Sequence, residues 1–272
     1  PVDGIFFDIV DARDDSSKWT KEGMQALGMN PEDHKQRIAY GEKVVHNFRN
    51  EMTAFVRQFN SDCTIFYNAG NIGPFERSSV DAYSHFELES LPSGGWGYMH
   101  FPVSMAFART LGKDCMGMTG KFHTSWGDFH SFKPQAALRF ECMRMLSMNA
   151  KCSIGDQLLP HGKICEYTYE LIGSVYEEVE AKEKWVKGAV SHSDIGVLTV
   201  EEFTKERTPR STSGALRMLT EGQHQYDVLD SQSDFTPYRL IILPDEIEVD
   251  EALAQKITDY VERGGSLITS YK

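Results

Sequence analysis

The sequence lacks any block of basic residues. It contains 28 Lys and Arg against 40 Asp and Glu, which gives a formal net charge of −12 at pH 7. A phosphate backbone or an anionic membrane attracts basic patches, so this charge balance argues against nucleic acid and membrane surfaces as partners. We expect neutral or cationic ligands instead.

Other absences exclude further classes of protein. No run of about 18 apolar residues is present, and no charged leader with an apolar stretch precedes the first predicted strand, so the sequence shows neither a membrane span nor a signal peptide. The five cysteines lack C-x-x-C spacing, and their odd number does not fit a disulfide framework. We expect buried thiols, a reducing compartment and a cytoplasmic location. The cysteines are Cys63, Cys115, Cys142, Cys152 and Cys165.

The composition is that of a folded protein. The 272 residues are 40% hydrophobic and 11% aromatic, which is ample for one large domain or two ordinary ones. The chain begins with Pro1 in place of an initiating Met, and a hydrophobic strand follows almost at once. We therefore expect it to be a piece of a longer protein.

Five hydrophobic strands are predicted in the first two thirds of the chain, and helix-sized intervals separate most of them. Each strand is followed by a crossover of about a dozen residues or more, and such connections produce parallel neighbours. The predicted strands are 4–10, 63–67, 82–91, 115–119 and 151–154, and the predicted helices are 38–59, 102–111, 134–148 and 167–182.

This series predicts the C-terminal portion of a (β/α)₈ TIM barrel over residues 1–188. A complete barrel typically takes about 250 residues, and the segment supplies about five of the eight units. The sequence therefore predicts that the missing units lie upstream of Pro1.

A second series begins at residue 189 and runs to Lys272. Its pattern is β-α-β-β-α-β, with strands at 194–200, 226–229, 238–244 and 266–269 and helices at 211–222 and 250–263. This order is typical of a flavodoxin-like, doubly wound sheet, and it stops on its last strand, so both domains are predicted to be truncated. The segment has no cysteine and no G-x-G-x-x-G after its first strand, which favours assembly over thiolate or dinucleotide chemistry.

The polar residues of the first series gather after the strands. His85, Glu87 and Glu89 alternate with apolar residues at a strand end, so they project from one face. Both barrels and open α/β sheets place their sites at the carboxyl ends of strands. The other candidates in such positions are Asn68, Trp96, His123, Trp126, Asp128, Asp156, Gln157 and, after the first strand, Asp8.

Carboxylates at several strand ends suit glycoside hydrolysis, which needs one nucleophile or base and one acid that protonates the leaving oxygen. Asp8 and one of Glu87 and Glu89 could form that pair, at the roughly 5 to 5.5 Å separation of retaining enzymes. Trp96 and Trp126 offer flat surfaces to the apolar face of a sugar ring.

Structural roles are open for the same residues. A strand-end aspartate often caps a turn, a glutamate can serve only as a salt-bridge partner, and tryptophan is commonly a core residue. The histidines, including His130, show neither H-x-x-x-H nor H-E-x-x-H spacing, so we expect substrate hydrogen bonds and no metal or cofactor. Glu141 is interpreted as a charge on the outer face or cap of a helix.

Three motifs together resemble a group of bacterial glycoside hydrolases related to α-L-fucosidases. They are ELESLPSGGWGY at 87–98, GKFHTSWGDF at 120–129 and AKCSIGDQ at 150–157. In that group a barrel precedes a domain similar to the trimerisation domain of β-galactosidases, and residues 193–272 resemble the start of that domain.

The resemblance implies a retaining exo-α-L-fucosidase acting on a glycoside or oligosaccharide. GIFFD at 4–8 is similar to the motif that ends the fourth barrel strand of fucosidases, so it implies that Asp8 is the nucleophile. The acid/base position varies among these enzymes, which leaves Glu87 and Glu89 both open. The first three strands are then expected upstream, and a homo-oligomer such as a trimer is expected from the second domain.

Two alternatives remain at this point. One is a β-galactosidase-like glycosidase, although those enzymes end the fourth strand with Asn-Glu where this chain has Phe7 and Asp8. The other is a carbohydrate-binding or oligomerisation module without catalytic activity.

Overall fold

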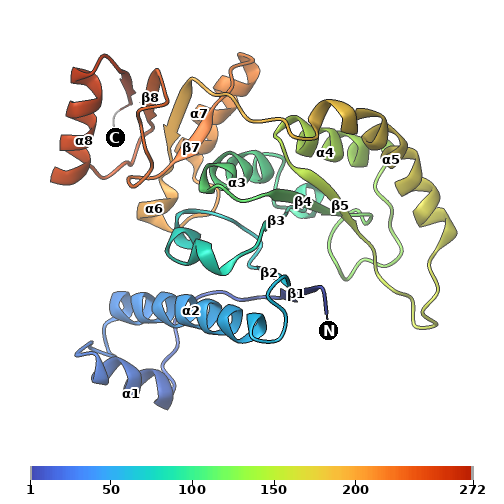
Figure 1. Cartoon of the computed structure of the whole chain (residues 1–272), viewed down its shortest axis with the longest axis horizontal. Helices are drawn as coiled ribbons and strands as arrows, with labels where there is room; N and C mark the ends of the chain where they lie inside the picture. The colour runs from blue at the N-terminus through green and yellow to red at the C-terminus, as the bar shows by residue number, and fades with distance from the viewer. Residues whose placement is uncertain (1, 271–272) are drawn as a thin grey trace. The chain divides into compact units, whose positions relative to one another are not determined.

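The computed structural model describes residues 2–270 (Figure 1). Pro1 and Lys272, the two ends on which the predicted truncation rests, lie outside these residues. The chain divides into two compact units, one of residues 2–70 with 76–85 and the other of residues 71–75 with the chain from Phe86 onward. Among residues 2–270, no helix has both the length and the apolar character needed to cross a membrane.

The first unit is built on two parallel strands. β1 (Gly4–Phe7) pairs with β2 (Thr64–Tyr67), with Gly4 opposite Thr64, and the rings of Phe7 and Tyr67 stack at 4.8 Å. Helices α1 (Lys18–Ala26) and α2 (His34–Arg57) lie between the strands in sequence. A 3₁₀ segment, η1 (Pro74–Ala82), follows β2.

The strand β1 is less buried than predicted. Its residues alternate between exposed and half-buried, and Phe6 is 44% exposed. Within the described chain β1 pairs only with β2, whereas Ile65, Phe66 and Tyr67 of β2 are buried. The prediction of a buried first strand was therefore wrong, and β2 forms the core of this unit.

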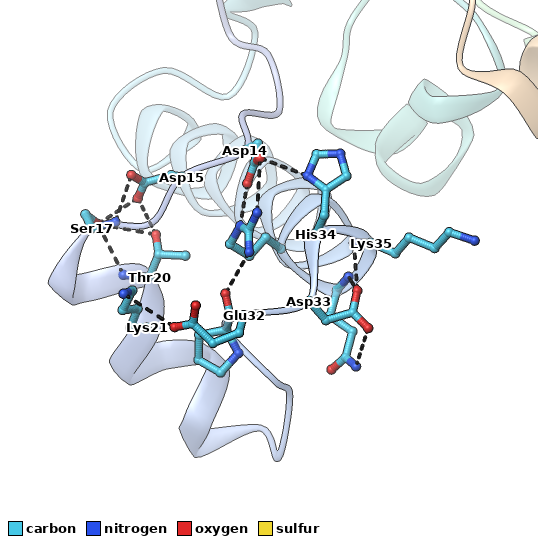
Figure 2. Close-up of polar contacts among 12 residues, drawn as sticks. Asp14, Asp15, Ser17, Thr20, Lys21, Glu32, Asp33, His34 and Lys35 are labelled. Carbon is cyan, nitrogen blue, oxygen red and sulfur yellow. Dashed lines mark hydrogen bonds and ion pairs between the residues drawn. The ribbon is translucent and has the colours of Figure 1, made fainter.

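Side-chain caps fix the N-terminal ends of α1 and α2 (Figure 2). Ser17 Oγ accepts from the Thr20 amide at 3.3 Å, and Asp33 Oδ1 accepts from the Lys35 amide at 2.8 Å. Both contacts satisfy amides that a helix leaves unpaired in its first turn. Helix α1 was missed in the sequence because it carries few apolar residues, and among its large ones Trp19 is exposed while Met24 is fully buried.

A further contact joins the segment before α1 to the first turn of α2. Asp14 lies 2.9 Å from His34 Nδ1 and 2.7 Å from Arg37 Nε (Figure 2). The hydrogen bond with Arg37, followed by that with His34, lowers the pKa of Asp14. Polar contacts thus order the long connection between β1 and α2, and a search for hydrophobic periodicity cannot detect such contacts.

The second unit begins with a three-stranded parallel sheet in the order β3-β4-β5. β3 (Phe86–Glu89) is followed by η2 (Pro92–Gly94), α3 (His100–Ala108) and η3 (Arg109–Leu111). β4 (Cys115–Gly120) leads to α4 (Gln135–Ser147), and β5 (Lys151–Gly155) leads to α5 (Glu166–Val186). Helices α4 and α5 pack against each other through a core that includes Leu138, Cys142, Ile172 and Val175 (Figure 1).

The rest of this unit is a four-stranded parallel sheet in the order β7-β6-β8-β9. Its strands are β6 (Ile195–Leu198), β7 (Asp227–Leu229), β8 (Leu240–Leu243) and β9 (Ser266–Thr269). Its helices are α6 (Glu201–Thr204), α7 (Arg210–Glu221) and α8 (Glu251–Glu262). β6, the first of these strands in sequence, pairs with both β7 and β8, and this order is a doubly wound topology.

The predicted fold class is confirmed, as part of a (β/α)₈ barrel followed by a doubly wound sheet. All five barrel strands and all four strands of the later sheet occur within four residues of their predicted boundaries. The short helix α6 and the 3₁₀ segments η1 and η2 were missed, α6 and η2 because they are too short to show a helical period and η1 because its backbone is not helical at Ser79. Of the five expected buried thiols, Cys63, Cys115 and Cys142 are buried, while Cys152 and Cys165 are half-buried.

A buried ion pair lies behind β4. Lys133 Nζ donates to Glu141 Oε2 at 2.6 Å, and Thr119 Oγ1 donates to the same oxygen at 2.6 Å. Glu141 is only 5% exposed and Lys133 only 3%. The interpretation of Glu141 as an outer-face or capping charge was therefore wrong, because the helix α4 turns this carboxylate toward the end of β4.

Replacing Glu141 with Ala should destabilise the protein strongly, because it leaves the Lys133 ammonium buried without its carboxylate. Removing one partner of a buried pair typically costs about 3–5 kcal/mol of unfolding free energy. Chemical denaturation followed by circular dichroism measures this loss. Glu178→Ala is the matched control, since it breaks the exposed Arg139–Glu178 pair and should change stability little. Equal effects of the two substitutions would contradict the account of Glu141.

Candidate active site

Asp8 directly follows β1, and its carboxylate is held by the residue that follows β2. Asn68 Nδ2 donates to Asp8 Oδ1 at 3.0 Å. The Asn68 side chain is itself oriented, because its Oδ1 accepts from the Gly70 amide at 3.0 Å. Asn68 is buried and Asp8 is exposed, so a fixed amide presents a solvent-accessible carboxylate at the end of two parallel strands.

Glu89 is the last residue of β3 and is only 8% exposed. Its Oε1 accepts from the indole Nε1 of Trp126 at 2.7 Å. Trp126 lies in the loop after β4, so this bond joins the ends of two neighbouring strands. The result is a buried carboxylate with a defined orientation at the carboxyl edge of the sheet.

The indole of Trp126 is fixed by packing as well. It contacts the Phe122 ring edge to face, with centroids 4.8 Å apart. It also lies across the end of β5, where a Cβ on Gly155 would come within 2.1 Å of Trp126 Cη2. Only glycine leaves room for the indole at that position, so β3, β4 and β5 all contribute to its placement.

The loop that carries Trp126 is closed on itself. Its base is the bond from the Lys133 amide to the Lys121 carbonyl at 2.8 Å, and Gln157 Nε2 donates to the Trp126 carbonyl at 2.8 Å. Asp128 accepts from Thr124 Oγ1, from the Ser131 amide and from Ser131 Oγ. These hydrogen bonds, that of the Ser131 side chain foremost, lower the pKa of Asp128 to about 2. Asp128 is therefore ionised near neutral pH and acts as a brace for the loop.

The remaining predicted residues are placed as follows. Glu87 lies two residues before Glu89 on β3 and is half-buried. Trp96 packs edge to face on His100 at 4.8 Å and remains 37% exposed. His85 Nδ1 lies 2.8 Å from Ser84 Oγ, and its ring is 6.0 Å from that of Phe66.

His123 and Asp156 lie at the ends of neighbouring strands in the second unit. His123 is exposed in the loop after β4, and its backbone amide donates to Ser131 Oγ at 2.9 Å. Asp156 follows β5 and accepts from the Gln157 amide at 2.8 Å. The structure thus brings Glu89, Trp126, Asp128 and Gln157 into one bonded group in the second unit, and Asp8 with Asn68 into another in the first.

Among residues 2–270, no three or more His, Cys, Asp and Glu side chains are grouped so that they could hold a metal ion.

Sequence reasoning missed two buried residues next to the site, Lys121 and Glu141. Lys121 is 3% exposed and donates to the Phe129 carbonyl at 2.8 Å, so it holds the same loop from inside. The signal that could have indicated both residues is a charge within an apolar stretch, because such a charge is buried only when it is paired.

Comparisons with known proteins agree with this architecture. The family profile of the β-galactosidase trimerisation domain matches residues 216–272. The structure of α-L-fucosidase isoenzyme 2 from Paenibacillus thiaminolyticus superposes with a TM-score of 0.93 at 41% identity, covering 99% of this chain and 42% of that one. No curated protein sequence matches the chain.

Two β-galactosidases share the fold at much lower identity. The enzyme from Bacillus circulans sp. alkalophilus has a TM-score of 0.70 at 13% identity, over 86% of this chain and 39% of that one. The enzyme from the psychrophilic Marinomonas ef1 has a TM-score of 0.64 at 14% identity, over 89% of this chain and 44% of that one. The chain thus spans about two fifths of the length of the structures it matches.

These matches define the class as a glycoside-hydrolase-like chain, with part of a barrel joined to a trimerisation-type domain. Within that class, the chain is a relative of the bacterial α-L-fucosidases, as its 41% identity over nearly its whole length shows. The recognition made from the three motifs is confirmed.

Trp126→Phe tests the hydrogen bond that orients Glu89. The change removes the N–H donor at 2.7 Å and keeps an aromatic ring, so it should lower the unfolding free energy by about 1 to 3 kcal/mol, the usual cost of leaving a buried acceptor without its donor. Urea unfolding followed by circular dichroism gives the value. Trp185→Phe, on the exposed end of α5, is the control and should have little effect. A Trp126 variant as stable as this control would contradict the assignment.

Proposed function

We propose that this chain carries the catalytic carboxylates of a retaining exo-α-L-fucosidase-like glycoside hydrolase. Asp8 is the nucleophile and Glu89 the general acid/base. The observation that carries the proposal is the oriented carboxylate at two strand ends, Asp8 bound by Asn68 and Glu89 bound by Trp126. The 41% identity to an α-L-fucosidase supports the choice of sugar.

Asp8 suits a nucleophile because one oxygen is held while the side chain stays accessible to a substrate. The Asn68 amide donates to Oδ1, which leaves the other oxygen for attack on the anomeric carbon. A fixed carboxylate also loses less conformational freedom when the transition state forms.

Glu89 is favoured over Glu87 as the acid/base by its position. Glu89 is the last residue of β3, whereas Glu87 lies two residues earlier in the strand. Barrel sites lie at the carboxyl ends of strands. Glu89 is also held by the Trp126 indole, which gives its carboxyl group a defined orientation.

The other strand-end residues are proposed to bind the sugar. His85, His123, Asp156 and Asn68 supply hydrogen-bonding groups for hydroxyls, and Trp96 and Trp126, each 37% exposed, supply ring faces for its apolar side. Asp128 and Gln157 support the loop that presents Trp126.

Two domains are proposed, with a boundary near residue 188, between the end of α5 and the start of β6. Residues 1–188 form the catalytic part and residues 189–272 the trimerisation-like part. The match of residues 216–272 to a trimerisation domain supports a homo-oligomer, with a trimer as the simplest case.

A β-galactosidase-like activity is the second candidate, because two β-galactosidases share the fold. The residues at the end of β1 argue against it, since Phe7 and Asp8 stand where the Asn-Glu of those enzymes is expected. Hydrolysis of aryl α-L-fucosides and aryl β-galactosides by the complete protein separates the two candidates.

Asp8→Gly in the complete protein should lower kcat for an aryl α-L-fucoside on the order of 10³-fold or more, because the covalent intermediate cannot form. Azide should restore turnover and give the fucosyl azide of inverted configuration, since azide then attacks in place of the carboxylate. Product analysis by NMR reads the configuration. Asp11→Gly, a few residues along the same segment, is the control, and an active Asp8→Gly protein would refute the assignment.

Glu89→Gln and Glu87→Gln form a matched pair for the acid/base. The true acid variant should lose about 10²- to 10⁴-fold on substrates with poor leaving groups and much less on an activated aryl fucoside, because the latter needs no proton. Added azide should then give the azide of retained configuration. We expect this pattern for Glu89→Gln only, and the same pattern for Glu87→Gln alone would reverse the assignment.

A further inference from the structure

We propose that Glu201, in the doubly wound domain, is a positioning residue for the catalytic site. It holds the 71–75 loop, which continues the chain from Asn68. The inference rests on the proposed role of Asp8 and Asn68, and it makes the second domain part of the active-site support as well as a means of assembly.

Glu201 reaches the loop by a direct contact. It is the first residue of α6, the element that follows β6, and its Oε1 accepts from Asn71 Nδ2 at 2.8 Å. Asn71 is only 8% exposed, so an amide without this acceptor would be costly to bury. The contact joins residues 130 positions apart in sequence.

The loop is also shaped to admit the Glu201 carboxylate. A Cβ on Gly73 would lie 2.3 Å from Glu201 Oε1 and 2.7 Å from Glu201 Cδ. No real side chain tolerates such a distance, so the carboxylate occupies the space that a side chain at position 73 would need. The backbone of Gly73 does not itself require glycine, because its φ lies outside the left-handed region.

The barrel part holds the same loop from α3. Ser104 Oγ accepts from the Ile72 amide at 3.0 Å and donates to the Ile72 carbonyl at 3.1 Å. Asn71 and Ile72 are therefore clamped between a helix of the barrel part and the first turn after β6. We expect the loop to lose its defined position when the contact with Glu201 is removed.

The chain carries this constraint to Asn68. Gly70 adopts a left-handed conformation, with φ 74°, and its amide donates to Asn68 Oδ1. That bond orients the amide whose Nδ2 binds Asp8. A loop released at Asn71 loosens the peptide at Gly70, and with it the orientation of the Asn68 side chain.

Glu202 provides a matched control one residue along the same helix. Its carboxylate accepts from the Ser231 amide at 2.8 Å and from Ser231 Oγ, so both contacts stay within the doubly wound domain. A substitution at Glu202 removes the same charge from the same short helix and leaves the Asn71 contact in place.

The first test compares Glu201→Ala with Glu202→Ala in the complete protein. For hydrolysis of an aryl α-L-fucoside, Glu201→Ala should lower kcat about 10-fold or more, because small misplacement of a reacting group is costly, whereas Glu202→Ala should stay within about twofold of wild type. Glu201→Gln keeps an acceptor for Asn71 and should recover most of the lost kcat. Hydrogen exchange of the peptide that spans 66–76 should speed up in Glu201→Ala and not in Glu202→Ala.

The second test uses the close approach at Gly73. Gly73→Ala should displace the Glu201 carboxylate and reproduce the loss of kcat seen in Glu201→Ala. The double variant should be no worse than Glu201→Ala alone, since the displaced group is already gone. Additive losses in the double variant would contradict the proposal.

The outcomes separate this inference from the proposed function. A wild-type protein without fucosidase activity overturns the proposed function, and hydrogen exchange then still reports on the loop. An active wild type with Glu201→Ala and Glu202→Ala equally active, and with equal exchange at 66–76, overturns the role of Glu201. A third outcome also overturns that role: Glu201→Ala and Glu202→Ala lose thermal stability and kcat equally, and Glu201→Gln restores neither. Glu201 would then be a purely structural residue.

Discussion

The register of the parallel sheet β3-β4-β5 is the constraint on which the bonded group around Glu89 depends. Glu89 pairs with Met118, and Gly120 pairs with Gly155, so the three strands end at nearly the same level. The loop after β4 can then reach both neighbours, giving its indole N–H to Glu89 and laying its ring over Gly155. A shift of one residue in the register would turn Glu89 to the opposite face and separate it from Trp126.

The doubly wound domain is joined to the β3-β4-β5 part of the second unit by polar contacts. Arg109 Nε donates to Asp227 Oδ1 at 2.7 Å, and Tyr238 donates to the other oxygen of that carboxylate at 3.1 Å. Burial of the hydroxyl raises the pKa of Tyr238, so it remains a donor over the physiological range. With the contact between Glu201 and Asn71, this ion pair ties the start of the second sheet to the barrel part at two places. Of these two contacts, that of Glu201 is the one proposed to support the site.

The sequence predicted the strands and helices well because their signal is local. Apolar runs and helical periods are properties of short windows, and the strand-end positions of Asp8 and Glu89 follow from parallel topology. The bond between Trp126 and Glu89 could not be read in this way, because a loop conformation depends on space left by Gly155, a residue on another strand.

The sequence also failed to indicate which charged residues are buried, because their burial depends on tertiary contacts. Glu141 lies in a helix whose residues alternate in character, so periodicity could not tell its inner from its outer face. Its partner Lys133 precedes the helix in a loop, and only the folded chain brings the two to 2.6 Å. Glu201 and Asn71 are an extreme case, since their contact joins two predicted domains.

The central claim is that Asp8 forms the covalent glycosyl intermediate. The most direct measurement is to inactivate the complete protein with a fucosyl fluoride that carries fluorine at C2, which slows release of the intermediate, and to locate the label by peptide mass spectrometry. The proposed role of Asp8 predicts a single fucosyl label on that residue. A label on Glu87, Glu89 or any other carboxylate, in a protein that the reagent inactivates, would contradict it.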